Sequence, residues 1–235
     1  MSIGELTTDQ AAPPLEHGDR LDRREFERRY DAMPACKKAE LIEGVVYMPP
    51  PVHFEQHGGP HFDLIWWLGS YKVFTPGVLS ADNTSNRLDL ENMPQPDAMM
   101  FIDPAHGGEA RISEDDYVVG PPEFVAEVSA SSAGYDRGPK LRVFRRHGVK
   151  EYLIWRVNDR QFDWFVLRNG DYAALEADEN GVLRSETFPG LWLNTNALLA
   201  GDLAQVLATL QQGIASTEHE AFVQGLQQYQ SQPKE

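Results

Sequence analysis

The chain has one cysteine, Cys36, so it can form neither an internal disulfide nor a zinc site built from several cysteines. No apolar run approaches the roughly 18–20 residues that a membrane span needs, so we expect no membrane partner. Basic residues are also scarce, because 21 Lys and Arg stand against 36 Asp and Glu, a net charge of −15. This balance argues against a protein that coats nucleic acid by bulk charge.

What is present is the composition of a globular core, with 41% hydrophobic and 10% aromatic residues among 235. The length suits one domain with extensions, or at most two small ones. We expect a flexible leader over residues 1–20, a single domain over residues 21–202, and a C-terminal helix with a Gln-rich tail over residues 203–235. Residues 1–19 have no basic region followed by an apolar stretch, which predicts no signal peptide and a cytoplasmic location.

The predicted elements alternate between helices and strands. We expect helices near residues 22–33, 57–71, 139–147 and 196–210, and strands near residues 40–48, 78–90, 97–103, 124–129, 151–157 and 161–167. Residues 172–176 and 182–187 are expected to extend the last two strands as a meander. The predicted fold class is therefore α/β, with a central mixed sheet that has an antiparallel component and is flanked by helices.

Two of the apolar strands carry acidic residues. In the strand at 124–129, alternation places Glu127 and Ser129 on one face with Val125. A buried unpaired carboxylate is costly, so Glu127 needs a metal ion or a lysine, unless it lies at an exposed strand end. Asp97 opens the strand at 97–103, or is a plain turn residue. If the two strands are neighbours, Asp97 and Glu127 meet and form a site suited to magnesium or manganese.

Lys140 lies within the apolar face of the predicted helix 139–147. On a helical wheel at about 100° per residue, Leu141 and Phe144 lie on its side, whereas the arginines lie opposite. A lysine in a buried face needs an acidic partner or a function, unless its side chain extends past the end of the helix. Glu40 precedes a short apolar strand and is either a surface acid or such a partner.

His53, His57 and His61 are spaced by four residues, as ligands on one face of a helix would be. The sequence Gly58-Gly59-Pro60 weakens the helix that such a face requires. We therefore do not expect a zinc site here.

Several segments form an ordered series: Glu-Leu-Ile-Glu-Gly (40–44), Pro-Asp (96–97), Pro-Glu-Phe-Val-Ala-Glu-Val-Ser (122–129), Gly-Tyr-Asp-Arg-Gly-Pro-Lys (134–140), Arg-Arg-His-Gly-Val-Lys-Glu-Tyr-Leu-Ile-Trp (145–155) and Phe-Pro-Gly-Leu-Trp-Leu (188–193). In this order and spacing they resemble the Uma-two family of restriction endonucleases, within the PD-(D/E)XK nuclease superfamily. The resemblance covers roughly residues 22–200. It implies a restriction-endonuclease-like core and metal-dependent hydrolysis of phosphodiester bonds in DNA.

Carried over residue by residue, Asp97 matches the motif aspartate and Glu127 the (D/E) position. Ser129 stands where the superfamily normally has lysine, a departure that the resembled family shares. The resemblance implies that Lys140, from the following helix, supplies the missing amine. Glu40 matches an acid that completes the metal site.

The resemblance therefore implies four catalytic residues, Asp97, Glu127, Lys140 and Glu40. Asp97, Glu127 and the carbonyl of Val128 are expected to hold Mg²⁺ or Mn²⁺, which lowers the pKa of a bound water. Lys140 is expected to orient that water or stabilise developing charge. Glu40 is expected to position the metal through water or to bind a second ion.

DNA is the expected substrate, and the densest basic stretch could meet its phosphates: Arg137, Arg142, Arg145, Arg146 and Lys150. Such a charge run is more often a solvated helix face. A homodimer would supply two sites for the two strands of a duplex. The alternative function is a catalytically inactive nuclease fold used as a binding or regulatory module, which the acidic core and Ser129 favour. A glycosidase with a carboxylate pair is the third reading, but it gives Lys140 no role.

Overall fold

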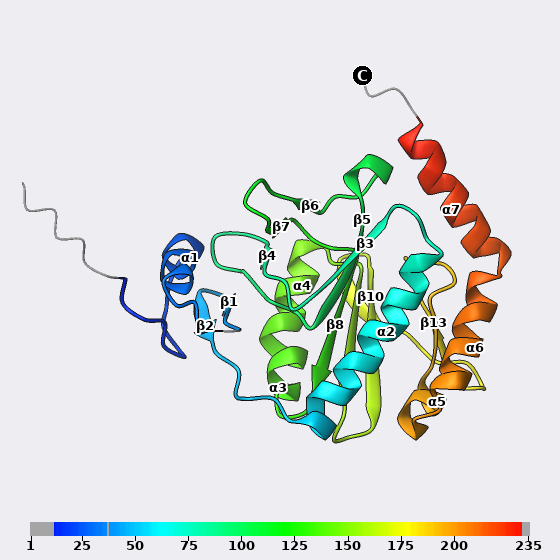
Figure 1. The fold of residues 1–235 in the computed structure, drawn as a ribbon, viewed down its shortest axis with the longest axis horizontal. Helices are drawn as coiled ribbons and strands as arrows, with labels where there is room; N and C mark the ends of the chain where they lie inside the picture. Colours follow the sequence, from blue (N-terminus) through cyan, green and yellow to red (C-terminus); the bar gives the residue numbers. More distant parts are fainter. Residues whose placement is uncertain (1–11, 37, 232–235) are drawn as a thin grey trace, which may run out of the picture.

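The computed structural model describes residues 12–36 and 38–231. Its centre is a six-stranded sheet in the order β11-β10-β9-β8-β5-β3 (Figure 1). These strands are β3 (Val78–Asp82), β5 (Ala98–Ile102), β8 (Phe124–Ser129), β9 (Glu151–Arg156), β10 (Gln161–Arg168) and β11 (Asp171–Ala174). Within this sheet β8 and β9 pair in parallel and the other neighbours are antiparallel. The predicted mixed α/β class with a central mixed sheet is therefore confirmed.

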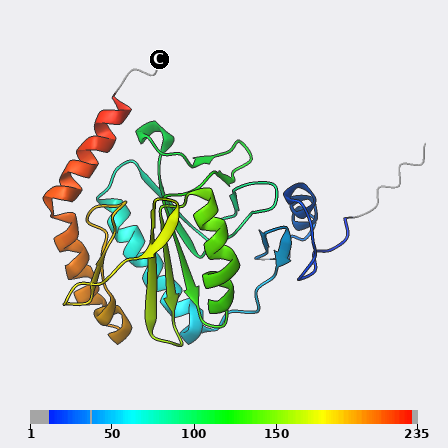
Figure 2. The same cartoon turned by 180° about the vertical axis from the view of Figure 1, so that it is seen from behind.

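Helices cover both faces of the sheet, as the two opposite views show (Figures 1 and 2). One face packs against α2 (Gly59–Val73), α5 (Thr195–Ala200), α6 (Leu203–Ile214) and α7 (Thr217–Gln230). The other face packs against α4 (Leu141–His147), which follows α3 (Ala133–Tyr135). The sheet is thus buried on both sides, which explains the nearly continuous apolar sequence of its central strands.

Strand β8 shows the predicted alternation of faces. Phe124, Ala126 and Val128 belong to the core on the α2 side, whereas Val125 belongs to the core on the α4 side. All six residues of β8 are buried, and Glu127 is 4% exposed. The alternative in which Glu127 lies at an exposed strand end is therefore wrong.

The N-terminal part forms a small module beside the sheet. It contains α1 (Arg23–Asp31) and a hairpin of β1 (Glu40–Ile42) and β2 (Val45–Tyr47), which turns at Glu43-Gly44. This hairpin brings Glu40 toward the sheet. A second small sheet joins β4 (Asn86–Arg87), β7 (Val118–Val119) and β6 (Arg111–Ile112).

The N-terminal end of the chain differs from the prediction, and the C-terminal end is helical. Residues 1–11 of the expected flexible leader lie outside the described residues. In the remainder of the leader Leu15 is 3% exposed, and the N–H of Gly18 donates to the carbonyl of Val46, so this segment packs on the hairpin. The expected Gln-rich tail forms α7 as far as Gln230, because Leu226 and His219 are buried against the body. Residues 232–235 lie outside the described part.

The C-terminal half departs from the prediction in two further places. Strand β12 (Val182–Arg184) does not extend the meander but pairs with β13 (Trp192–Asn194) in a separate hairpin. The helix expected over residues 196–210 is divided, because α5 ends at Gly201 with positive φ and Asp202 caps α6. None of the helices in the described part is long and apolar enough to cross a membrane.

Glu151, at the start of β9, anchors the segment that joins β12 to β13. Its carboxylate accepts hydrogen bonds from the backbone N–H groups of Glu186 and Thr187 at 2.7 Å each. It also accepts from Ser185 Oγ and from Trp164 Nε1 at 2.9 Å. Burial raises the pKa of Glu151, while the hydrogen bonds from Thr187, Ser185 and Trp164 oppose that rise. Glu151 is therefore a buried acid with a structural role.

We expect Glu151→Ala to destabilise the protein by about 3 kcal/mol or more, because it leaves four donors without their acceptor, and those of Ser185 and Trp164 are buried. The exposed Glu179 provides the control, since Glu179→Ala removes a carboxylate without this network. Urea denaturation followed by circular dichroism measures both. Equal free energies of unfolding for the two variants would contradict the structural role of Glu151.

Candidate active site

The predicted acidic pair meets at one edge of the β5–β8 pairing. Ala98 of β5 lies opposite Ala126 of β8, so continuation of this register by one residue sets Asp97 opposite Glu127. Both alanines face the α2 side, and alternation therefore turns Asp97 and Glu127 to the α4 side. Both acids are buried and line a pocket of about 540 Å³. The expected proximity of the two strands is confirmed.

Lys140 projects its ammonium group into this acidic cluster. Its Nζ lies 2.8 Å from Glu40 Oε1, contacts Glu127 Oε1, and lies 4.0 Å from Asp136 Oδ1. The residue is 1% exposed. Burial alone would lower the pKa of Lys140, but the surrounding carboxylates outweigh it and hold the pKa above its ordinary value. Lys140 therefore has the acidic partners that a lysine in a buried face requires.

The backbone around Lys140 explains how it reaches the carboxylates. A π-helical turn, Asp136–Lys140, stands between α3 and α4, so the helical segment begins at Ala133 rather than at Pro139. Pro139 has no N–H to donate, which interrupts the regular hydrogen-bond pattern at this point. Lys140 thus lies inside the helical segment, and the alternative in which it extends past the helix end is wrong.

Asp97 is held from three sides. Its Oδ2 accepts from the N–H of Val128 at 2.8 Å, and its Oδ1 contacts Lys38 Nζ at 2.8 Å and His57 Nε2 at 3.6 Å. Burial would raise the pKa of Asp97, but Lys38 and the Val128 N–H outweigh it and lower the pKa. Because the Val128 N–H donates to Asp97, the backbone edge of β8 that faces β5 points toward the Asp97 carboxylate.

Glu127 has the opposite electrostatic environment. Burial raises its pKa well above the ordinary value, and the charges of Asp97 and Asp136 raise it further, against the lowering effect of Lys140. Its Oε1 is buried and has no partner with hydrogen-bond geometry among the described residues, although Lys140 Nζ lies beside it. The two acids therefore have pKa values that are shifted in opposite directions.

Ser129 and Ser132 serve the cluster as donors. Ser129 Oγ donates to Asp136 Oδ2 at 2.7 Å, and Ser132 Oγ donates to the same oxygen at 2.6 Å. Burial nevertheless raises the pKa of Asp136. Ser129, which stands where the superfamily has lysine, thus orients Asp136 in the π-helical turn. The amine of the cluster comes from Lys140.

Sequence reasoning missed Lys38, Asp136 and Tyr135, all of which line the pocket. His53 and His57 also line the pocket, and His61 lies next to it. The rings of His57 and His61 stack at 5.4 Å, and His61 Nε2 lies 3.0 Å from the carbonyl oxygen of Asp97. The four-residue spacing of the histidines was the signal that could have placed them beside the acids.

The basic stretch is largely neutralised. Four of its five members have a carboxylate partner within the described part: Arg137 with Asp163, Arg142 with Glu43, Arg145 with Asp171 and Lys150 with Glu123. Arg142, Arg145 and Arg146 line a separate shallow pocket on the far side of α4. This stretch therefore presents little free positive charge.

The donor set of the pocket fits a hard divalent cation in its chemistry, because Asp97, Glu127 and Glu40 offer carboxylate oxygens and Val128 a carbonyl. Across residues 12–36 and 38–231, no group of three or more His, Cys, Asp or Glu side chains is arranged as metal ligands. The carboxylates contact lysine ammonium groups instead.

Comparisons with known proteins identify a family. A family model named Uma2 and described as "Putative restriction endonuclease" matches residues 23–196. A solved structure described as a putative nuclease belonging to DUF820 from Anabaena variabilis is similar, with 12% sequence identity and a TM-score of 0.49. That match covers 74% of this chain and 92% of the other. No curated protein matches the chain.

We expect Lys140→Met to destabilise the protein by about 3–5 kcal/mol, because it leaves buried carboxylates without their cation. Lys72→Met is the control, since Lys72 is exposed on α2. Chemical denaturation at neutral pH gives the two free energies of unfolding. Adding Glu127→Gln to Lys140→Met should recover part of the loss. A change no larger than that of Lys72→Met would show that the buried charges are not coupled.

Proposed function

Because the chain belongs to the Uma2 family, described as putative restriction endonucleases, we propose that it is a metal-dependent endonuclease that hydrolyses phosphodiester bonds in DNA. The observation that carries the proposal is the composition of the pocket. It buries four carboxylates, those of Glu40, Asp97, Glu127 and Asp136, and sets two lysines against them.

The charges of this cluster do not balance. With every group ionised, Lys38 and Lys140 compensate two of the four carboxylates and leave two negative charges in excess. Uncompensated charge in a buried site is costly. A divalent cation supplies the missing charge, and oxygen donors of this kind suit Mg²⁺ or Mn²⁺. Without a cation, protonation of Glu127 and Asp136, whose pKa values are raised, removes the excess instead, so a bound cation would displace protons from these acids.

Asp97, Glu127 and the Val128 carbonyl would hold the ion, with Glu40 acting through water or on a second ion. When bound, such an ion polarises a phosphoryl oxygen and lowers the pKa of a water molecule. The N–H of Val128 fixes the Asp97 carboxylate, and Lys140 fixes Glu40 and Glu127 relative to each other. We propose that the Lys140 ammonium also orients the attacking water or stabilises negative charge on the phosphate as it develops.

The direct test is cleavage of single-stranded, duplex and plasmid DNA with Mg²⁺ or Mn²⁺. We expect Asp97→Asn and Lys140→Ala each to lower the rate by about a hundredfold or more, since the first removes a carboxylate that would hold the ion and the second removes positive charge near the reacting phosphate. Lys72→Ala should cleave as the unaltered protein does. A chelator should abolish cleavage in every sample.

Two results would count against the proposal. Cleavage that survives in Asp97→Asn would exclude this pocket as the active site. Absence of both cleavage and metal binding would instead favour the catalytically inactive module. Two observations support that alternative: the chain has more acidic than basic residues, and most of the basic stretch is paired with carboxylates.

The paired arginines predict how DNA binding depends on salt. Because most of the basic stretch already has carboxylate partners, few lysine and arginine side chains are free to displace counterions from DNA. We expect the logarithm of the affinity for duplex DNA to fall with the logarithm of the salt concentration with a slope of magnitude below about 3. Fluorescence anisotropy between roughly 50 and 200 mM salt measures the slope. A slope of magnitude about 6 or more would show that the ion pairs open to engage phosphates.

A homodimer is part of the proposal, because cutting both strands of a duplex requires two sites. Light scattering of the purified protein measures its mass and would show one chain or two.

A further inference from the structure

Buried polar atoms without hydrogen-bond partners gather in the candidate active site. Seven buried side-chain nitrogen and oxygen atoms have no partner among the described residues. Three of the seven belong to residues that line the 540 Å³ pocket. One of these, Glu127 Oε1, is in contact with Lys140 Nζ, which leaves His57 Nδ1 and the hydroxyl of Tyr135 without a partner. Such atoms destabilise a fold unless something binds to them, so their concentration in one pocket indicates a ligand.

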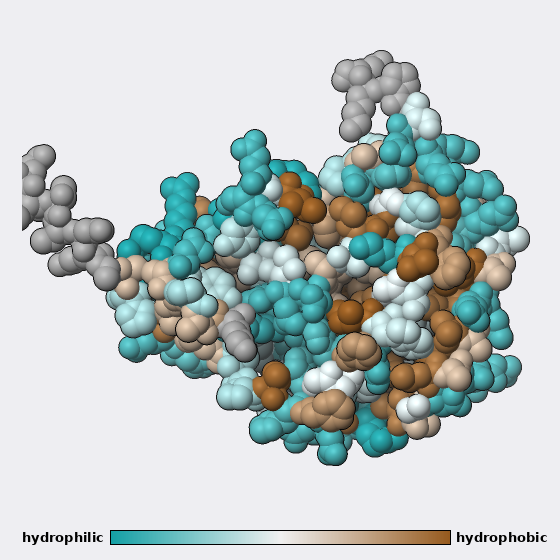
Figure 3. Space-filling view, in the orientation of Figure 1, coloured by the Kyte–Doolittle hydropathy of each residue, from teal (hydrophilic) through white to brown (hydrophobic). Residues whose placement is uncertain are grey.

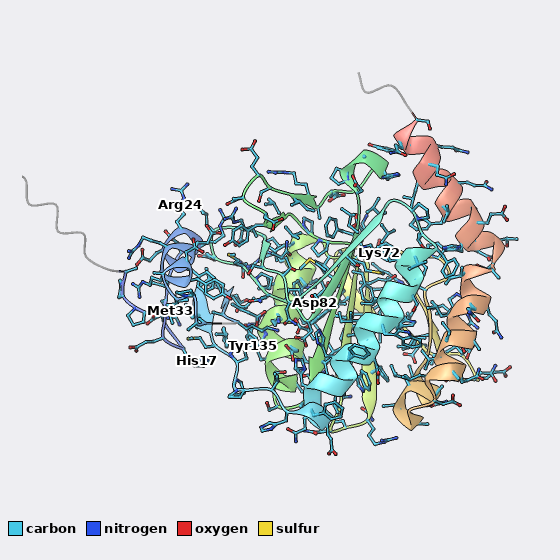
Figure 4. The ribbon with its side chains drawn as sticks, viewed as in Figure 1. His17, Arg24, Met33, Lys72, Asp82 and Tyr135 are labelled. Atoms are coloured by element: carbon cyan, nitrogen blue, oxygen red, sulfur yellow. The ribbon has the colours of Figure 1, made fainter. Side chains whose placement is uncertain are left out.

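The position of the Tyr135 hydroxyl is fixed by its ring. The ring packs on that of Tyr47 with centroids 4.0 Å apart, and Lys140 Nζ lies 5.7 Å from its centre. Tyr135 ends α3, directly before the π-helical turn, and lies where the N-terminal module meets the sheet (Figure 4). Its hydroxyl is therefore held in the pocket by packing and not by a hydrogen bond.

The neighbouring acids already have donors of their own. Glu40 Oε1 accepts from the N–H of Gln95 and from Lys140, both within 2.8 Å. Asp136 Oδ2 accepts from two serine hydroxyls. Tyr135 is thus a donor without an acceptor in a pocket whose other polar groups are mostly acceptors.

We propose that Tyr135 is a substrate-binding residue whose hydroxyl donates a hydrogen bond to a phosphate oxygen. This inference rests on the proposed function, since it takes the ligand of the pocket to be a phosphate ester. A phosphodiester offers only acceptor oxygens, and the two lysines of the pocket are engaged by carboxylates. A neutral O–H donor that has no protein partner meets this need without adding charge.

The test compares Tyr135→Phe with Tyr47→Phe in the full chain with Mg²⁺. Both variants remove one hydroxyl from the same pair of packed rings, but the Tyr47 hydroxyl is not among the buried atoms without partners. Calorimetry with inorganic phosphate measures binding, and thermal unfolding measures stability. We expect Tyr135→Phe to weaken phosphate binding by about tenfold or more, without lowering the melting temperature. Tyr47→Phe should stay within about twofold of the unaltered protein.

Three results would overturn the inference: no phosphate binding by the unaltered protein, equal effects of the two substitutions, or a lower melting temperature in Tyr135→Phe. The last would mean that the hydroxyl has a structural partner. DNA cleavage by the unaltered protein is scored separately. If the unaltered protein cleaves DNA and Tyr135→Phe has no effect on phosphate binding, only the role of Tyr135 is refuted. If Tyr135→Phe selectively loses phosphate binding but the unaltered protein does not cleave DNA, the role of Tyr135 is supported and the nuclease function is refuted.

Discussion

The contact of the Lys140 ammonium with buried carboxylates is the constraint on which the rest of the structure depends. Its partners come from three separate parts of the chain, because Glu40 begins β1, Glu127 lies in β8 and Asp136 begins the π-helical turn. Charges buried to this depth are tolerated only when paired in good geometry. The N-terminal hairpin, the central sheet and the helix on its α4 side must therefore meet at this point, and the pocket forms where they do.

The sequence predicted the parts of this arrangement that depend on local periodicity. Alternation along residues 124–129 identified the faces of β8, and the helical wheel identified Lys140 as an inward-facing lysine. Asp136 was missed because the π-helical turn brings it to the cluster, and such a turn leaves no clear pattern in the sequence. Lys38 was missed because it lies in a connecting segment whose position depends on the hairpin that follows.

The ends of the chain show the same limit. The periodicity of residues 217–230 is weak, and α7 is ordered through tertiary contacts of Leu226 and His219, which composition does not reveal. Gly201, with positive φ, divides the expected C-terminal helix into α5 and α6.

The surface over α2 and α5–α7 keeps apolar patches, whereas the N-terminal side is mainly hydrophilic (Figure 3).

The proposed substrate, DNA, is a polyanion, and this acidic chain would have to recognise it without a broad basic surface. Because the arginines near α4 are paired, the proposed function assigns phosphate recognition to the pocket, where a cation would join carboxylates to phosphate. The measurement that tests this account most directly is calorimetric titration of the purified chain with Mn²⁺. The account predicts binding that Asp97→Asn and Glu127→Gln each weaken by at least about a hundredfold, while Glu151→Gln leaves it unchanged in the folded protein. Absence of Mn²⁺ binding, or binding that both pocket substitutions leave intact, would contradict it.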